Sequence, residues 1–421
     1  MRRGVVVTGI GVISPLGDSA AALHRALCDG VDARAPVEGF AVDGLPARSA
    51  VELRGFDPAR YLGEGNFRPL DRTGLLAASA ARLALDDAGW SAEAAAEREL
   101  ALLVGTMFGS VRTIAEFDRR GLEAGPLYVK PFDFANSVIN AAAGQTAIWH
   151  HLRGANSTVS AGTVSGVQAI ALGADLVAEG RAEVALAGGA EELCFESFLA
   201  FCRAGAMVDE DGPPRPFDAR HGGFVLGEGA AFLVLESEEG AAARGANVLA
   251  TVLGHGAAFD PSQGEDRGSG ARAVARAVRL ALEEAGLPPE AVSAVSAAAS
   301  GHRCADRKEA GGLGLALGAR AATVPVTAPK GLLGECLGAS GALQAAALVA
   351  AMGAGELPGV PGFDAGEEGF PLAAASAAPT TANLAIGLVN GVGLDGHCCA
   401  LLLGRGPAAG AASRRRAEGD G

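Results

Sequence analysis

The sequence predicts a layered α/β fold, because short apolar runs alternate with segments of helical periodicity. Near-continuous apolar runs indicate strands that are covered on both faces of a sheet. Six such strands are expected at Val5–Thr8, Ala101–Val104, Glu183–Ala187, Ala230–Glu236, Leu249–Leu253 and Cys399–Leu403. Strands that alternate with helices are typical of folds in which helices cover a sheet.

Two of the intervening helices have clear ends. In residues 164–178 the apolar side chains recur at helical spacing, and the pattern stops at Gly180. In residues 271–285 the same spacing stops at Gly286, with Pro288 beyond it. Glycine commonly follows the last helical turn, and proline cannot continue a helix. Both segments are therefore predicted to be helices.

The chain is long enough for two domain-sized units or one duplicated fold. It has 421 residues, of which 49% are hydrophobic, so it can bury a large core. The polar stretch 237–247 separates two strong strands and marks the expected boundary between an N-terminal half, 1–240, and a C-terminal half, 241–406. Residues 407–421 lack apolar periodicity, which favours a disordered tail.

Charge and cysteine usage exclude several classes of partner. The formal net charge is −14, from 34 basic and 48 acidic residues, so the chain has no general attraction for nucleic acid or an anionic membrane. No run approaches the roughly 18 uninterrupted apolar residues of a membrane-spanning helix. Pro15 interrupts the apolar N-terminal run, which we interpret as a strand and not as a signal peptide. Seven scattered cysteines indicate reduced thiols and a cytoplasmic location.

Neither a dinucleotide site nor a metal site is predicted. Gly9 and Gly11 begin a glycine fingerprint, but Ser14 stands where the third glycine belongs, so a turn at the strand end is expected. The segments His302-Arg303-Cys304 and His397-Cys398-Cys399 place imidazoles near thiols. Their spacing matches no recurrent zinc site, so we expect these side chains to pack in the interior.

The sequence VSAGTVSGVQAI at residues 159–170 is typical of an elbow at which a strand turns into a helix. Thr163 lies at its tip, where the positive end of the helix dipole is expected. A thiol at this place would be acidic and reactive, whereas a threonine hydroxyl stays protonated near neutral pH and needs an adjacent base. Thr163 is therefore either a nucleophile with an unseen base or a small polar residue that fills the turn.

Five segments, in order along nearly the whole chain, carry a family resemblance. They are VVVTGIGVISPLG at the N-terminus, NSTVSAGTVSGVQAIALGADLVAEGRAEVALAGGAEE, RPFDARHGGFVLGEGAAFLVLE, APKGLLGECLGASGALQAA and NGVGLDGH. Together they resemble the β-ketoacyl synthases of the thiolase superfamily. In that family a nucleophilic cysteine precedes the Ala-Gly-Gly-Ala-Glu segment at a fixed distance. Counting back from Ala187–Glu191 places Thr163 at the cysteine position.

The resemblance implies a thiolase-like duplicated fold. Two similar βαβαβαββ halves would form a five-layer αβαβα core. The resemblance also places Asp218, Glu309 and Lys330 at structural family positions. It implies neither a metal nor an organic cofactor.

The first catalytic histidine of the family is replaced. Active members use a cysteine to carry the acyl chain and two histidines to stabilise the enolate or oxyanion. Alignment on Asp306 and Glu309 places Ala298 at the first histidine, and His302 follows four residues too late.

The second catalytic histidine is also replaced, by Glu335, which follows Gly334. An ionised carboxylate there would repel a developing oxyanion. If it is buried, it must pair with a cation or become neutral, and Lys330 is the expected partner. Replacement of the nucleophile and both histidines indicates a chain that is kept for its fold.

This combination resembles the chain length factors, which are the ketosynthase β subunits of bacterial type II polyketide synthases. In that family a degenerate subunit pairs with an active ketosynthase α subunit, which extends chains held on the phosphopantetheine of an acyl carrier protein. Many members carry glutamine at the cysteine position, from which Thr163 departs. The resemblance implies a subunit that stabilises its partner, shapes the product tunnel and sets the length of a polyketide or polyene. Two alternatives stay open: an active acyltransferase or condensing enzyme that uses Thr163, and a homodimeric pseudoenzyme scaffold.

The same resemblance places the tunnel and the subunit interface in residues 107–121 and 130–145. The candidate tunnel or interface residues are Met107, Phe108, Val111, Ile114, Phe134 and Gln145. Phenylalanine is concentrated here in a chain with few aromatic residues, and such side chains suit either a hydrophobic acyl chain or a large protein interface.

Overall fold

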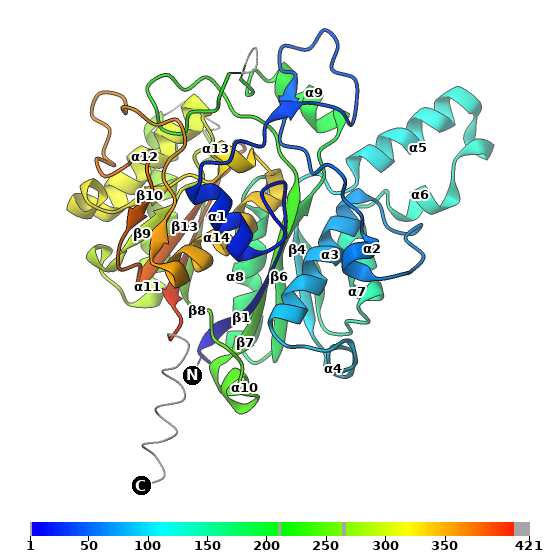
Figure 1. The fold of residues 1–421 in the computed structure, drawn as a ribbon, viewed down its shortest axis with the longest axis horizontal. Coiled ribbons are helices and arrows are strands. Elements are labelled where there is room, and N and C mark those ends of the chain that lie inside the picture. The colour runs from blue at the N-terminus through cyan, green and yellow to red at the C-terminus, as the bar shows by residue number, and fades with distance from the viewer. Residues whose placement is uncertain (1, 209–211, 263–266, 408–421) are drawn as a thin grey trace.

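The structure is a computed structural model, and it describes residues 2–208, 212–262 and 267–407 of the chain. Within these residues, ten strands form one hydrogen-bonded sheet with helices on both faces (Figure 1). Of the predicted tail, 407–421, all but Pro407 lies outside the described residues.

The sheet consists of two halves that meet at β1 and β8. From this junction the strand order is β1-β7-β6-β4-β5 on one side and β8-β14-β13-β9-β10 on the other. Antiparallel pairing of Val5 with Val252 joins the two halves. The first half contains β1 (Val5–Ile13), β4 (Ala101–Gly105), β5 (Asn156–Val159), β6 (Val184–Glu191) and β7 (Gly229–Ser237). The second contains β8 (Ala250–Phe259), β9 (Ala294–Ser296), β10 (Val326–Thr327), β13 (Ile386–Val392) and β14 (His397–Arg405).

Helices separate and cover these half-sheets to give five layers. The outer face of the first half packs on α3 (Arg72–Asp87) and α7 (Ala141–Trp149). The outer face of the second packs on α11 (Arg267–Ala285), which in turn packs on α12 (Arg303–Leu317). Between the half-sheets lie α8 (Ser165–Ala178) and α14 (Ser340–Ala354), which contact strands of both. This αβαβα order is the thiolase-like fold that the resemblance predicts.

The remaining elements are short and mostly flank this core. They are α1 (Ala20–Cys28), β2 (Ala35–Pro36), β3 (Ser49–Ala50), α2 (Ala59–Leu62), α4 (Ala92–Glu97), α9 (Phe195–Arg203), α10 (Glu238–Ala243), η2 (Pro289–Ala291), η3 (Gly318–Ala322), α13 (Lys330–Leu333), η4 (Leu337–Ala339), β11 (Glu356–Leu357) and β12 (Thr380–Thr381).

The six predicted strands and both predicted helices are confirmed, with most strands longer than their apolar runs. The turn expected at Gly9 and Gly11 is wrong, because β1 continues through both residues to Ile13. A side-chain carbon on Gly9 would lie 2.5 Å from the carbonyl oxygen of Ala84 in α3. Glycine is therefore present in this strand so that the backbone of α3 can approach it closely.

One described helical segment, Leu337–Ala354, is long and apolar enough to cross a membrane by length and composition. However, 83% of it is buried inside the protein, as is typical of a core helix.

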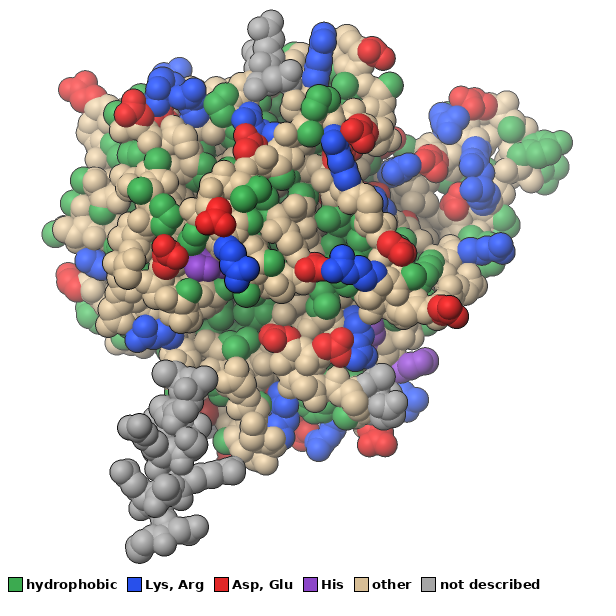
Figure 2. All heavy atoms as spheres, in the orientation of Figure 1, with side chains coloured by type: hydrophobic (Ala, Val, Ile, Leu, Met, Phe, Trp, Pro, Cys, Tyr) green, Lys and Arg blue, Asp and Glu red, His purple; other side chains and the backbone are tan. Residues whose placement is uncertain are grey.

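An arm projects from the body of the protein (Figure 1). It comprises α5 (Val111–Ala124), η1 (Pro126–Tyr128) and α6 (Pro131–Ala135), and no residue of α5 is buried. Figure 2 shows apolar side chains at the far end of the arm, where Leu127 is 93% exposed. The other large apolar side chains that the arm exposes are Leu122, Tyr128, Phe132 and Phe134. Monomeric proteins seldom expose so many large apolar side chains together.

Candidate functional site

The elbow predicted from the sequence is present between β5 and α8. Gly162 has a φ of 61°, which lets the chain turn sharply before the helix. Ser165 fixes the turn, because its hydroxyl accepts from the N–H of Ala161 at 2.9 Å and donates to the carbonyl of Gly162 at 2.6 Å. Thr163 is buried at the tip, directly before the first turn of α8.

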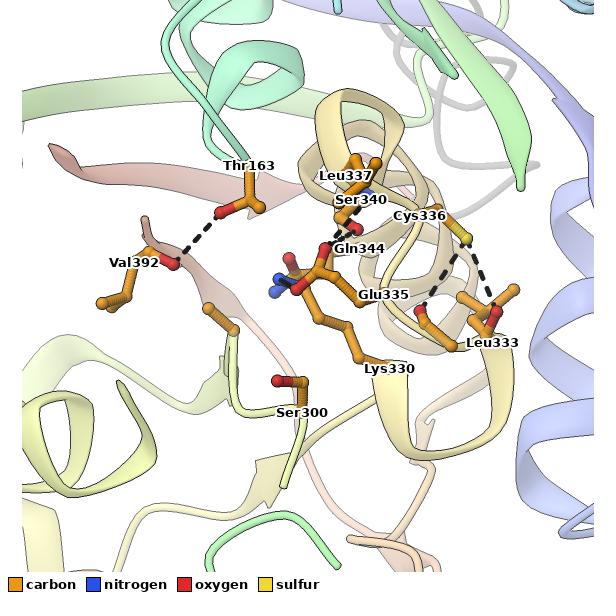
Figure 3. A network of polar contacts seen from close by, with 12 residues as sticks. Thr163, Ser300, Lys330, Leu333, Glu335, Cys336, Leu337, Ser340, Gln344 and Val392 are labelled. Atoms are coloured by element: carbon orange, nitrogen blue, oxygen red, sulfur yellow. Dashed lines mark hydrogen bonds and ion pairs between the residues drawn. The ribbon is translucent and has the colours of Figure 1, made fainter. Parts of the chain in front are cut away.

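The hydroxyl of Thr163 donates to the backbone carbonyl of Val392 at 3.2 Å (Figure 3). A hydroxyl nucleophile is activated when its proton is directed at a base such as histidine. A peptide carbonyl is not a base near neutral pH, so this hydrogen bond holds the hydroxyl in its protonated and weakly nucleophilic form. The geometry therefore favours the reading of Thr163 as a residue that fills the turn.

Glu335 is a buried carboxylate whose oxygens both have partners (Figure 3). One oxygen lies 2.8 Å from Nζ of Lys330, which is itself buried. The other accepts from the hydroxyl of Ser340 at 2.6 Å and from the N–H of Leu337 at 3.1 Å. The pairing with Lys330 expected from the sequence is thus present. The negative charge of Glu335 is therefore balanced by a cation of the same chain.

Ala298, which the sequence predicts at the position of the family's first histidine, has only a methyl side chain. Its N–H donates to Oε1 of Glu309 at 2.7 Å, and the side-chain amide of Asn390 donates to the same oxygen at 2.6 Å. Burial raises the pKa of Glu309 to about 7. Its other carboxyl oxygen has no hydrogen-bond partner within the described part of the chain.

His302 does not substitute for the missing histidine. Its Nδ1 caps α12 by accepting from the N–H of Ala305 at 3.3 Å. Burial lowers the pKa of His302, which agrees with a neutral ring that accepts a hydrogen bond through Nδ1.

Asp218 anchors a loop through hydrogen bonds to both of its carboxyl oxygens. It is buried and accepts from the guanidinium of Arg220 and from the N–H groups of Asp364 and Ala365. The Arg220 guanidinium holds the pKa of Asp218 well below its usual range. The carboxylate therefore joins the turn at 217–220 to the loop at 364–365.

The tunnel candidates lie in two places. Met107 and Phe108 lie at the base of the arm and are partly buried. Val111, Ile114 and Phe134 lie on the arm itself, where the ring of Phe134 is 6.0 Å from that of Phe117. The sixth candidate, Gln145, lies in α7 and is partly buried.

Sequence reasoning missed the group that holds the base of the arm. Glu191 accepts from the N–H groups of Met107 at 2.5 Å and Phe108 at 2.9 Å, and from Gly338 N–H at 3.0 Å. Burial raises the pKa of this carboxyl to about 7. Glu191 therefore connects the base of the arm to the segment that follows Glu335. The acid at the end of the Ala-Gly-Gly-Ala-Glu segment was its only signal in the sequence.

No metal centre is assigned in the described residues. One group, Asp175, His255 and Glu284, has ligand atoms close enough to hold an ion. The guanidinium of Arg2 contacts both of its carboxylates and supplies the positive charge that an ion would supply. Burial raises the pKa values of Cys398 and Cys399 to about 12, so these thiols are protonated and pack in the interior.

Comparison with known proteins agrees with this geometry. A family model described as the beta-ketoacyl synthase N-terminal domain matches residues 2–241, and the corresponding C-terminal domain matches residues 249–364. The 3-oxoacyl-[acyl-carrier-protein] synthase 2 of Rhizobium meliloti (strain 1021) is 34% identical over 82% of this chain and 85% of its own length. A putative polyketide beta-ketoacyl synthase 2 of Streptomyces coelicolor is 36% identical over 96% of this chain and 95% of its own length.

A solved structure extends the likeness to three dimensions. The ishigamide ketosynthase/chain length factor superposes with a TM-score of 0.90 at 31% identity, over 97% of this chain and 100% of that chain. The five-layer fold and its elbow therefore define a protein of the ketosynthase type. This chain belongs to the beta-ketoacyl synthase family.

The buried pair of Lys330 and Glu335 should be sensitive to removal of one partner. Lys330→Met leaves the carboxylate of Glu335 buried without its cation, which is expected to destabilise the protein by about 3–5 kcal/mol. The measurement is the midpoint of urea unfolding. Lys130→Met, at an exposed lysine, is the control and should leave the midpoint unchanged. Lys330→Met/Glu335→Gln should recover most of the loss, and a double variant as unstable as Lys330→Met would contradict the assignment.

Stability should fall as pH rises through 7 because of Glu309. Its folded pKa of about 7 lies above the ordinary value near 4.3. The stabilisation is therefore complete below about pH 4 and is lost as pH rises through 7, by up to about 1.4 kcal/mol per pH unit. Glu309→Gln removes this ionisation and should make the profile of thermal unfolding less steep between pH 5 and 7, while the buried Glu191, whose pKa is also raised to about 7, keeps its own contribution to the slope. Glu179→Gln, at an exposed carboxylate, should leave the slope as in the wild type.

Proposed function

We propose that this chain is a chain length factor, the catalytically degenerate subunit of a ketosynthase heterodimer. The observation that carries the proposal is the hydrogen bond from Thr163 to the carbonyl of Val392, in place of a bond to a base. Claisen condensation by this family needs a nucleophile that carries the acyl chain. The active partner subunit would supply that nucleophile and both histidines.

The other two vacated positions support the same reading. Ala298 has no side-chain donor for a developing oxyanion, and Glu335 brings a negative charge that Lys330 engages. An oxyanion is stabilised by donors and positive charge directed at it. The pair of Lys330 and Glu335 is instead closed on itself and on Ser340.

The arm and the free edge of the sheet supply a surface for the partner. The arm exposes the large apolar side chains of Leu127, Tyr128, Phe132 and Phe134. Its longest helix, α5, has no buried residue. Strand β5 ends the sheet and is only partly buried, and such an edge can pair with another chain. Apolar aromatic side chains of this kind are enriched in protein interfaces.

In this proposal, Met107 and Phe108 help to wall the product tunnel, while Val111, Ile114, Phe134 and Gln145 serve the subunit interface. The acyl chain would enter on the phosphopantetheine of an acyl carrier protein that serves the partner's cysteine. The two halves of the chain, 1–240 and 241–406, would act as one scaffold in the cytoplasm. Asp218, Glu309 and Lys330 would keep structural roles.

A second candidate is a condensing enzyme that acts through Thr163. The identity with a 3-oxoacyl-[acyl-carrier-protein] synthase favours it. A third is a homodimeric scaffold in which a second copy of this chain covers the arm. Measurements of elongation and of ketosynthase recovery distinguish these two candidates from the heterodimer.

The catalytic test is co-expression with a ketosynthase that has the intact Cys, His and His set. Malonyl-dependent elongation on acyl carrier protein is measured for the wild type, for Thr163→Ala and for a variant of the partner's cysteine. We expect Thr163→Ala to retain full activity, because its hydroxyl carries no acyl group, and we expect loss of the partner's cysteine to abolish elongation. Elongation by this chain alone, lost in Thr163→Ala, would contradict the proposal and establish the second candidate.

The interface test uses a charge at the end of the arm. Leu127→Asp places a carboxylate in an apolar contact and should reduce recovery of the co-expressed ketosynthase at least about tenfold, since burying an unpaired charge is costly. Leu315→Asp, at a half-exposed leucine on α12, is the matched control and should leave one-to-one recovery intact. A wild type that forms homodimers and captures no ketosynthase would support the scaffold instead.

A further inference from the structure

We propose that Asp395 closes the elbow of this chain to acyl thioesters, so that the site excludes them even if a nucleophile is restored. The inference rests on the proposed degenerate role of the site. It identifies a second obstacle to acylation of residue 163, in addition to the replaced catalytic residues. Asp395 lies in the loop between β13 and β14, which belongs to the C-terminal half of the chain.

The carboxyl group of Asp395 lies directly against the elbow. A side-chain carbon built on Gly162 would lie 2.5 Å from Oδ2 of Asp395 and 2.9 Å from its carboxyl carbon. These separations are shorter than a van der Waals contact, so the carboxyl group packs directly on the backbone of residue 162. Residue 163 is the next residue along the chain, and a charged or acylated side chain there would meet the negative charge of Asp395 at close range.

The loop holds Asp395 in this position through His397. The N–H of His397 donates to Oδ1 of Asp395 at 3.2 Å, and Nδ1 of His397 lies 3.1 Å from Oδ2. The ring of His397 packs edge-on against Phe259, with ring centres 4.9 Å apart. Asp260 is another carboxylate beside this loop, and it accepts from Ser262 and lies 3.6 Å from Lys308.

The end of β13 and the loop that follows it contact the elbow at two points. The backbone carbonyl of Val392, the last residue of β13, accepts a hydrogen bond from the Thr163 hydroxyl, and Asp395 in the loop packs on Gly162. Helix α8 begins at residue 165 and has no acidic residue in its first turn. Asp395 thus brings a carboxylate from outside to the positive end of α8, where a negative charge is favourable.

This arrangement opposes two chemical species. A thiolate at residue 163 would lie beside a like charge, which raises its pKa and lowers its reactivity at neutral pH. A malonyl-type thioester carries its own carboxylate and would be repelled by Asp395. Restoring cysteine alone therefore should not restore a reactive elbow, and removal of the carboxylate is also required.

The test compares Thr163→Cys with Thr163→Cys/Asp395→Asn in the full-length chain. The pKa of the introduced thiol is measured from the ultraviolet absorbance of the thiolate, as a difference from the wild type with its seven native cysteines. We expect Asp395→Asn to lower this pKa by about one unit, which corresponds to about tenfold more thiolate at neutral pH. Alkylation, followed by mass spectrometry, should accelerate for neutral iodoacetamide and accelerate further for anionic iodoacetate.

The matched control is Thr163→Cys/Glu179→Gln. Glu179 caps the opposite end of α8, and its side chain is 44% exposed, against 41% for Asp395. This control should leave the thiol pKa and both rates unchanged. If the side-chain amide introduced by Asp395→Asn disturbs the loop, Asp395→Ser removes the same carboxylate and serves as a second test.

An equal pKa and equal rates with and without the Asp395 carboxylate would overturn the inference. That result would leave the heterodimer proposal intact, because capture of the partner and elongation do not depend on it. Failure to capture a ketosynthase would contradict the heterodimer and would leave the effect of Asp395 on the thiol measurable.

Discussion

Close packing of α8 and α14 between the two half-sheets is the constraint on which the rest of the structure depends. A side-chain carbon on Gly166 would lie 2.8 Å from the carbonyl of Gly338, and one on Gly341 would lie 3.0 Å from the N–H of Val167. Only glycine permits such close approach of the two backbones at these positions. Both helices begin at the site, so their packing also brings Thr163 close to the segment that carries Glu335.

Thr163 and Glu335 at the candidate site both have hydrogen-bond partners within the chain. Thr163 donates to Val392, and Glu335 receives Lys330 and Ser340. Glu309 and Asn390 support the backbone beside Ala298. Stabilisation of an oxyanion requires donors and charges directed at the transition state, whereas here these groups contact one another.

Glu191 links the candidate site to the base of the exposed arm. It binds the backbone of Met107 and Phe108 at the base of the arm and that of Gly338 beside the Glu335 segment. A buried carboxyl group with several N–H donors is a rigid junction. The position of the arm is thereby tied to the segment that begins α14.

The sequence alone determined the alternation of strands and helices and the elbow at 159–170, and it predicted that Thr163, Ala298 and Glu335 replace three catalytic side chains, because apolar periodicity and motif spacing are local properties. It also suggested the pair of Lys330 and Glu335, which lie five residues apart. Only the tertiary structure decided that Gly9 and Gly11 lie within a strand, because α3 approaches from 70 residues away in the chain. The contacts of Asp395 with Gly162, and of Glu191 with Gly338, likewise join distant segments, and no local pattern encodes which of them meet.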